Sequence, residues 1–178
     1  MQIFSTITDF RQACANASRP LGLVATMGAL HKGHITLIQQ STSECAATAA
    51  TLFVNPSQFG PREDFRNYPA NLQSDLKTFE REGIQFLFAP TVEEVYPTDF
   101  DTWIQVGKLG SRLEGKFRPG HFQGVTTIVC KLLSMSKPTK AYFGQKDVQQ
   151  SLVIQRMNAD LNLGAEIVVV PTVRDSDG

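Results

Sequence analysis

Apolar and polar positions repeat along the chain with two periods, one typical of strands and one typical of helices. Short apolar runs at residues 21–24 and 46–54 predict buried strands, and turn residues follow each run. Between them, apolar positions over residues 33–44 recur with helical spacing. A strand, a helix and a second strand in this order are typical of a parallel sheet whose strands are joined by helices.

The remaining pattern continues this alternation. It predicts a helix over residues 70–82 that ends at Gly83, with Pro69 at its entry, and a short strand over 84–88. A helical turn over 92–95, an edge strand over 103–106 and a long apolar helix after residue 121 follow. The last elements are a strand within 141–147, a helix from about residue 148 and a strand over 166–170. We expect one α/β domain over residues 1–178, with a mainly parallel sheet and helices on both faces.

Composition and charge limit the classes of partner. The chain has 178 residues, and its 17 basic residues balance 17 acidic ones, so no broad basic field favours a nucleic-acid partner. No apolar run approaches the ~20 residues that a membrane span needs, and the first residues lack the layout of a secretory signal. The three cysteines have no metal-like spacing. We therefore expect a cytoplasmic protein with neither a membrane nor a nucleic-acid partner.

The first candidate site follows the first predicted strand, where a glycine-containing turn leads into a helix. Such a junction attracts anions, because the first backbone N–H groups of a helix are unpaired and the helix dipole favours negative charge. His31 and His34 lie there, and charged imidazoles donate hydrogen bonds from both ring nitrogens to a phosphate. The alternatives are surface or capping histidines. A zinc site is disfavoured, because the third histidine, His121, lies far along the chain with no cysteine pair near it.

Three further segments carry polar side chains at positions where an α/β sheet binds ligands. Asn55 and Gln58 follow the second predicted strand, although turn chemistry alone would also explain Asn55. Lys146 lies at a later strand-to-helix junction and is able to neutralise phosphate, while Asp147 beside it suits either a helix cap or a ribose contact. Residues 116–121 concentrate positive charge before a helix, and a solvated basic turn explains this equally well.

Four strings in the sequence are similar to those of a known family. They are T-M-G-A-L-H-K-G-H at 26–34, F-V-N-P-S-Q-F at 53–59, R-P-G-H-F-Q-G-V at 118–125 and F-G-Q-K-D-V-Q-Q at 143–150. The H-x-G-H box resembles the signature of the nucleotidylyl transferase superfamily. The full set resembles the pantothenate synthetases, or pantoate–β-alanine ligases. Lys32 and Gln145 stand where that family usually has Glu, and Ser74 stands where it often has a second acid.

The resemblance implies a Rossmann-like domain that uses ATP and Mg²⁺ to join pantoate to β-alanine through a pantoyl adenylate, in a protein that forms homodimers. It implies catalytic roles for His34, His31 and Lys146, and a Mg²⁺ contact for Asp75. The residues implied to bind ATP are Met27, Gly28, Ala29, Leu30, His31, Lys32, Gly33, His34, Gly144, Gln145, Lys146, Asp147 and Val173. Those implied to bind pantoate or β-alanine are Met27, Asn55, Gln58, Arg118, His121 and Gln150.

Two alternative functions stay open at this stage. Members of the family continue past the matched region into an S-S-R-N segment that closes over the triphosphate and a small C-terminal lid domain. A chain without these parts would act as a binding and dimerisation domain without turnover, because each lost transition-state donor typically costs ~10²-fold or more in rate. Another H-x-G-H enzyme, such as a cytidylyltransferase or a fragment of a class I tRNA synthetase, is disfavoured by the amide-bearing loop at residues 55–59 and the neutral net charge.

Overall fold

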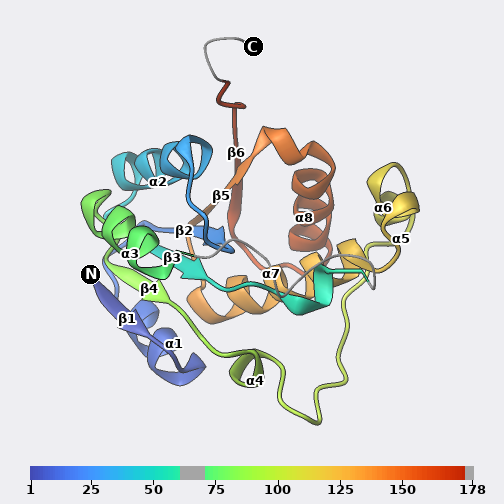
Figure 1. Cartoon of the computed structure of the whole chain (residues 1–178), viewed down its shortest axis with the longest axis horizontal. Helices are drawn as coiled ribbons and strands as arrows, with labels where there is room; N and C mark the ends of the chain where they lie inside the picture. The colour runs from blue at the N-terminus through green and yellow to red at the C-terminus, as the bar shows by residue number, and fades with distance from the viewer. Residues whose placement is uncertain (61–70, 175–178) are drawn as a thin grey trace.

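A six-stranded sheet forms the centre of the computed structural model, which describes residues 1–60 and 71–174 (Figure 1). The strands lie in the order β1–β4–β3–β2–β5–β6, and every neighbouring pair is parallel. Their bounds are Gln2–Phe4 (β1), Leu21–Thr26 (β2), Ala47–Leu52 (β3), Phe86–Phe88 (β4), Lys140–Gly144 (β5) and Glu166–Val170 (β6). The predicted α/β class with a parallel sheet is confirmed.

Helices cover both faces of the sheet, as predicted. Helices α2 (Lys32–Glu44) and α3 (Leu72–Arg81) lie on one face, while α1 (Ile7–Ala15), α7 (His121–Ser136) and α8 (Val148–Asp160) lie on the other. Successive strand residues point to opposite faces, so Leu23 packs in the core beneath α1, α7 and α8 and Val24 packs in the core beneath α2 and α3. No helix in the described ranges is long and apolar enough to cross a membrane.

The direction in which the sheet grows reverses between β2 and β5. From β2 the chain adds β3 and then β4 on one side, and it later returns to add β5 and β6 on the other side. Parallel sheets of this kind bind ligands beyond the carboxyl ends of the strands at the point of reversal. The segments after β2 and β5, which carry the two histidines and Lys146, therefore meet at one place.

Several short helices connect these elements, and one connecting segment corrects a prediction. They are η1 (Pro56–Gln58), α4 (Val92–Val95), α5 (Gly107–Gly110), α6 (Glu114–Phe117) and η3 (Gln145–Asp147). The edge strand predicted over 103–106 is wrong, because this segment forms no strand and pairs with none of the strands in the described ranges. Instead, α7 holds it through side chains: the Ile104 N–H donates to Thr127 Oγ1 at 3.0 Å, and the Thr126 hydroxyl donates to the Ile104 carbonyl at 2.5 Å.

The sequence patterns assigned no element to the first 20 residues, where the structure has β1 and α1. Thr6 caps α1 by accepting a hydrogen bond from the Asp9 N–H, and Phe10 and Cys14 are buried four residues apart. The capping threonine and the spacing of these two apolar residues are sequence signals that predict a helix. The predicted start of the third helix, Ala70, and the preceding Pro69 lie outside the described residues, and within them α3 is capped by Asn71.

Candidate active site

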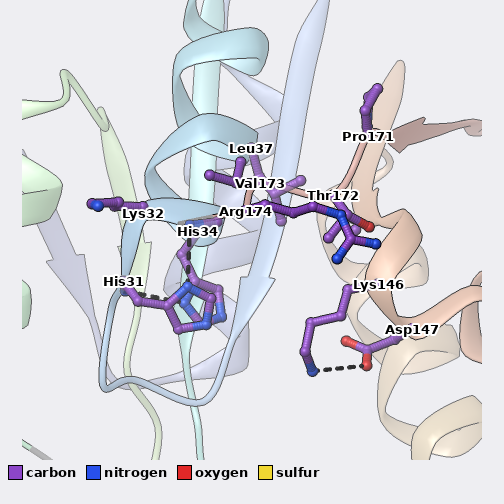
Figure 2. A pocket seen from close by; sticks show the side chains of 12 residues that line it. His31, Lys32, His34, Leu37, Lys146, Asp147, Pro171, Thr172, Val173 and Arg174 are labelled. Atoms are coloured by element: carbon purple, nitrogen blue, oxygen red, sulfur yellow. Dashed lines mark hydrogen bonds and ion pairs between the residues drawn. The ribbon is translucent and has the colours of Figure 1, made fainter. Parts of the chain in front are cut away.

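Two adjoining pockets lie at the carboxyl edge of the sheet. The first, called here the histidine pocket, has a volume of about 420 Å³, within the usual range for small-molecule sites. It lies between the start of α2, the β5–α8 junction and the segment after β6 (Figure 2). Its lining residues are His31, Lys32, Gly33, His34, Leu37, Gly144, Lys146, Asp147, Pro171, Thr172, Val173 and Arg174.

The second, called here the amide pocket, has a volume of about 180 Å³ and lies against α7. Its polar lining comes from Thr26, His34, Thr51, Asn55, Gln58, Asp147 and Gln150, and its apolar lining includes Met27, Phe53, Val125, Ile128 and Phe143. His34 and Asp147 line both pockets. A ligand group in the amide pocket therefore meets a ligand group in the histidine pocket beside the His34 ring.

The N-terminus of α2 fixes the hydrogen-bonding state of both histidines. The His31 ring accepts a hydrogen bond at Nδ1 from the Gly33 N–H at 3.1 Å. The His34 ring accepts at Nδ1 from the His31 N–H at 3.4 Å, so the two form a reciprocal capping box. Because a backbone N–H only donates, both Nδ1 atoms carry no proton, and each neutral ring has its N–H at Nε2. The capping alternative and a ligand-binding role are therefore compatible.

The charge state of His34 differs from the sequence expectation of two charged imidazoles. Burial, followed by the neighbouring His31, lowers the pKa of His34 from 6.5 to about 4, and the carboxylates of Asp75 and Asp147 only partly oppose this shift. At neutral pH His34 is uncharged in this structure. It offers a single Nε2–H donor rather than two donors and a positive charge.

Lys146 supplies a positive charge opposite the histidines. Figure 2 shows the two imidazole rings facing Lys146 and Asp147 across the pocket, with Arg174 extending over the same space. The Lys146 ammonium lies 3.5 Å from the Asp147 carboxylate, and both side chains are more than half exposed. An exposed ion pair of this kind is weak, so an entering phosphate competes readily with Asp147 for the ammonium group.

A buried carboxylate shapes the turn between the two pockets. Asp75 is only 4% exposed, and its two oxygens accept hydrogen bonds from the Ala29 N–H at 2.9 Å and the Leu30 N–H at 3.0 Å. Gly28 and Ala29 both have positive φ angles, of 93° and 51°. Asp75 therefore holds an otherwise unfavourable turn that carries the chain from Met27 in one pocket to His31 in the other.

Side-chain amides order the loop at the amide pocket. Asn55 is buried, and its Nδ2 donates to Gln58 Oε1 at 3.0 Å and to the Gly124 carbonyl at 3.2 Å. Gln58 Nε2 lies 3.1 Å from Met27 Sδ, at the pocket wall. A Cβ atom at Gly124 would overlap the Ser57 carbonyl, so only glycine lets η1 pack this closely on α7. Asn55 therefore joins the loop to Gln58 and α7 in addition to forming a turn.

The basic cluster before α7 is placed differently from the sequence prediction. Arg118 and His121 do not line either of the two pockets in the described residues. Arg118 is paired with Glu114 at 2.7 Å and lies 3.2 Å from His121 Nε2, while His121 Nδ1 lies 2.9 Å from the Gln58 carbonyl oxygen. Since a carbonyl only accepts, His121 donates from Nδ1 and accepts from Arg118, and it holds the Gln58 backbone.

The chain matches known proteins along nearly all of its sequence. The family model described as Pantoate-beta-alanine ligase matches residues 2–178. The chain belongs to the pantoate–β-alanine ligase family. The pantothenate synthetase of Chloroflexus aurantiacus is 51% identical over 178 residues, which cover 100% of this chain and 63% of that relative. Pantothenate synthetase 1 of Bradyrhizobium diazoefficiens is 49% identical, with 100% and 64% covered.

Solved structures of the family have the same fold. The pantothenate synthetase of Thermus thermophilus superposes with a TM-score of 0.96 at 47% identity, covering 100% of this chain and 64% of that one. The pantoate–β-alanine ligase of Francisella tularensis, complexed with β-γ ATP and β-alanine, has a TM-score of 0.94 at 37% identity, covering 99% and 69%. The chain therefore spans about two-thirds of the length of the family members it matches.

Most residues that the family resemblance implied lie at one or both pockets. Gly28, Ala29 and Leu30 form the turn between them, and Gln145 lies in η3 between Gly144 and Lys146. Asp75, for which the resemblance implies a Mg²⁺ contact, holds the turn here, because each of its oxygens accepts one backbone hydrogen bond. Among the described residues, no group of three or more His, Cys, Asp or Glu side chains is placed to hold a metal ion.

Three residues around the site received no role in the sequence analysis, although Gln149 and Gly124 stand within the quoted strings. Tyr96 donates to Asn55 across a sequence separation of 41 residues. Gln149 is buried and donates to the carbonyls of Leu109 and Arg112, so it anchors α5 and α6 while its neighbour Gln150 lines the amide pocket. Gly124 carried the one available signal, since an isolated glycine in an apolar helix indicates a close backbone approach.

Proposed function

We propose that the protein containing this chain joins pantoate to β-alanine with ATP as the energy source. The observation that carries the proposal is the meeting of the two pockets at His34, in a chain that belongs to the pantoate–β-alanine ligase family. The histidine pocket suits a nucleotide phosphate, and the amide pocket suits a small hydroxy acid. The Francisella tularensis ligase, complexed with β-γ ATP and β-alanine, supports the choice of ligands.

In the first step, a pantoate carboxylate oxygen attacks the α-phosphorus of ATP, the bond to the β-phosphate breaks, and pyrophosphate leaves. Two anions must be brought together, so positioning and charge neutralisation dominate the energetics. Gln58 and Gln150 hold pantoate in the amide pocket. The Nε2–H of His34 donates to a phosphate oxygen at the junction, and His31 and Lys146 stabilise the negative charge that develops on the triphosphate.

In the second step, the amine of β-alanine attacks the carbonyl carbon of the pantoyl adenylate. The amide bond forms, a proton leaves the amine, and AMP departs with the electrons of the broken C–O bond. The neutral His34 ring suits this step also, because it stabilises the departing phosphate oxygens by hydrogen bonding without holding them as an ion pair would. The phosphates of ATP would hold Mg²⁺ beside Lys146, and the ion would neutralise part of the triphosphate charge.

The proposal extends to assembly and location. Residues 1–178 form one ATP- and pantoate-binding domain, and the protein is a cytoplasmic homodimer. The free thiols of Cys14, Cys45 and Cys130 support the location. The dimer follows from the family resemblance, and the exposed apolar side chains of Leu113 and Phe117 beside α6 are candidates for its surface. Sedimentation equilibrium checks the dimer, and a monomer at all concentrations would refute it.

The direct experiment titrates the chain with pantoate and then with Mg-ATP in a calorimeter, followed by pantoate-dependent ATP–pyrophosphate exchange on the same sample. We expect both ligands to bind. Exchange would place the complete first step within residues 1–178. Binding without exchange would make this chain the substrate-binding part of a longer ligase, and absence of binding to both ligands would refute the proposal.

A further inference from the structure

The orientation of the Asn55 side chain is determined from both of its ends. Its Oδ1 accepts hydrogen bonds from the Tyr96 hydroxyl at 2.8 Å and from the Ser57 hydroxyl at 2.8 Å. Its Nδ2 donates to two carbonyl-type oxygens, those of Gln58 and Gly124. An inverted amide would point its NH₂ group at two hydroxyls and its oxygen at two acceptors, so the observed orientation is strongly preferred.

The Asn55 orientation fixes that of Gln58. Because Asn55 Nδ2 is a donor, the atom of Gln58 that faces it must be Oε1, and Nε2 must face Met27 and the amide pocket. His121 fixes the backbone of the same residue through the Gln58 carbonyl. Gln58 therefore presents N–H donors to the pocket and keeps its acceptor turned away from the ligand.

Packing around the Tyr96 ring fixes the position of its hydroxyl, and this hydroxyl in turn fixes the orientation of the Asn55 amide. The edge of Phe100 packs on its ring at a centroid distance of 5.0 Å, and Trp103 stacks against it at 6.2 Å. The Lys131 ammonium lies 5.4 Å from the ring centroid and donates to the Val95 carbonyl beside it. These contacts come from the 96–103 segment and from α7. The Tyr96 hydroxyl is therefore positioned by the tertiary fold and not by the loop at residues 55–59 that it contacts.

We infer that Tyr96 is a positioning residue that acts through Asn55 to set Gln58 as a hydrogen-bond donor, so that the amide pocket selects a ligand with an acceptor oxygen at that point. The identity of the ligand as pantoate rests on the proposed function. A carboxylate or hydroxyl oxygen of a hydroxy acid satisfies the Gln58 N–H, whereas an amide NH₂ or ammonium group at the same place would face a donor and be rejected.

The test compares Tyr96→Phe, Ser57→Ala and the double variant with the unmodified chain. Tyr142→Phe is the matched control, since Tyr142 is also buried but its hydroxyl contacts Glu44 and Cys45, away from both pockets. The first readout needs no ligand: nuclear magnetic resonance of the Asn55 and Gln58 side-chain amides. We expect Tyr96→Phe to shift and broaden these signals, and Tyr142→Phe to leave them unchanged.

The second readout is affinity for pantoate and, separately, for Mg-ATP. Loss of one hydroxyl donor should weaken pantoate binding about three- to tenfold, and the double variant should lose more than the product of the two single effects. Mg-ATP affinity should change less than twofold. A merely structural role for Tyr96 would lower both affinities together, and that result would overturn the inference.

The two readouts separate this inference from the proposed function. If the unmodified chain binds no pantoate, the proposed function fails, while the amide signals still decide whether Tyr96 orders Asn55 and Gln58. If the chain binds pantoate and Tyr96→Phe leaves both the amide signals and the pantoate affinity unchanged, the inference is wrong and the proposed function stands.

Discussion

Replacing Asp75 by Asn tests whether this carboxylate organises the turn between the pockets. The change preserves size and removes the charge, but an Asn side chain has only one oxygen acceptor for the two N–H groups of Ala29 and Leu30. One backbone donor then faces an NH₂ group in a buried place. The turn also contains two residues at positive φ, Gly28 and Ala29, so it relaxes once its anchor is weakened.

The magnitude follows from the hydrogen bonds that change. A hydrogen bond to a charged group contributes about 1.5–3 kcal/mol, and a buried unsatisfied donor costs about 1–3 kcal/mol, so we expect a loss of about 2–4 kcal/mol in the free energy of unfolding. With a urea dependence of about 2 kcal/mol per molar, the unfolding midpoint should fall by about 1–2 M.

The assay is urea unfolding followed by circular dichroism, without ATP or Mg²⁺. The matched control is Asp160→Asn, because Asp160 is an exposed carboxylate that pairs with Arg156 on α8 at 3.0 Å, and such a pair contributes only about 0.3–0.5 kcal/mol. If Asp75→Asn unfolds at the same urea concentration as the unmodified chain and weakens only Mg²⁺-dependent ATP binding, then Asp75 acts on the metal and the structural reasoning is refuted.

Three further outcomes follow from the same site. The pKa of His34 in the folded state, about 4, lies below its ordinary 6.5, so the unfolded state binds a proton first and stability falls as pH decreases from about 6.5 to 4. Urea midpoints measured across this pH range should show the loss, and His34→Gln should reduce it. A titration of the His34 ring near pH 6.5 would contradict the prediction. Gly124→Ala should push the Ser57 backbone off α7 and weaken pantoate binding at least tenfold in calorimetry, whereas unchanged affinity would show that the loop adjusts. Lys146→Gln should weaken Mg-ATP binding about tenfold with little effect on pantoate, and the exposed Lys77→Gln on α3 should change neither; equal effects of the two would remove Lys146 from the site.

Several features of the site were predictable from sequence because they depend on local chemistry. The strand, turn and helix around His31 and His34 follow from periodicity and glycine placement, and the motif strings indicated the family. Strand-to-loop position placed Gln58 and Lys146 at the carboxyl edge of the sheet, and the family resemblance added Gln150; all three line the pockets. Local patterns are informative here because parallel strands bring all their following loops to one edge.

Other features are visible only in the folded structure, because they depend on contacts between distant segments. The segment 103–106 has apolar residues that suit a strand, yet the hydroxyls of α7 hold its backbone in place of a strand partner. Arg118 and His121 form a basic cluster in sequence, but Glu114 and the Gln58 carbonyl take up their hydrogen bonds in the fold. No pattern in these stretches specifies the partner.

From the sequence alone, hydrophobic periodicity predicted the main elements from β2 to β6 and the parallel sheet, and contiguous motifs predicted many of the residues that line the two pockets. The tertiary structure decided their states: which amide end of Gln58 faces the pocket, which histidine nitrogen carries the proton, and whether His34 is charged. These depend on burial and on donors and acceptors such as Tyr96 and Asp75, which lie dozens of residues away in the chain and meet the site only after folding.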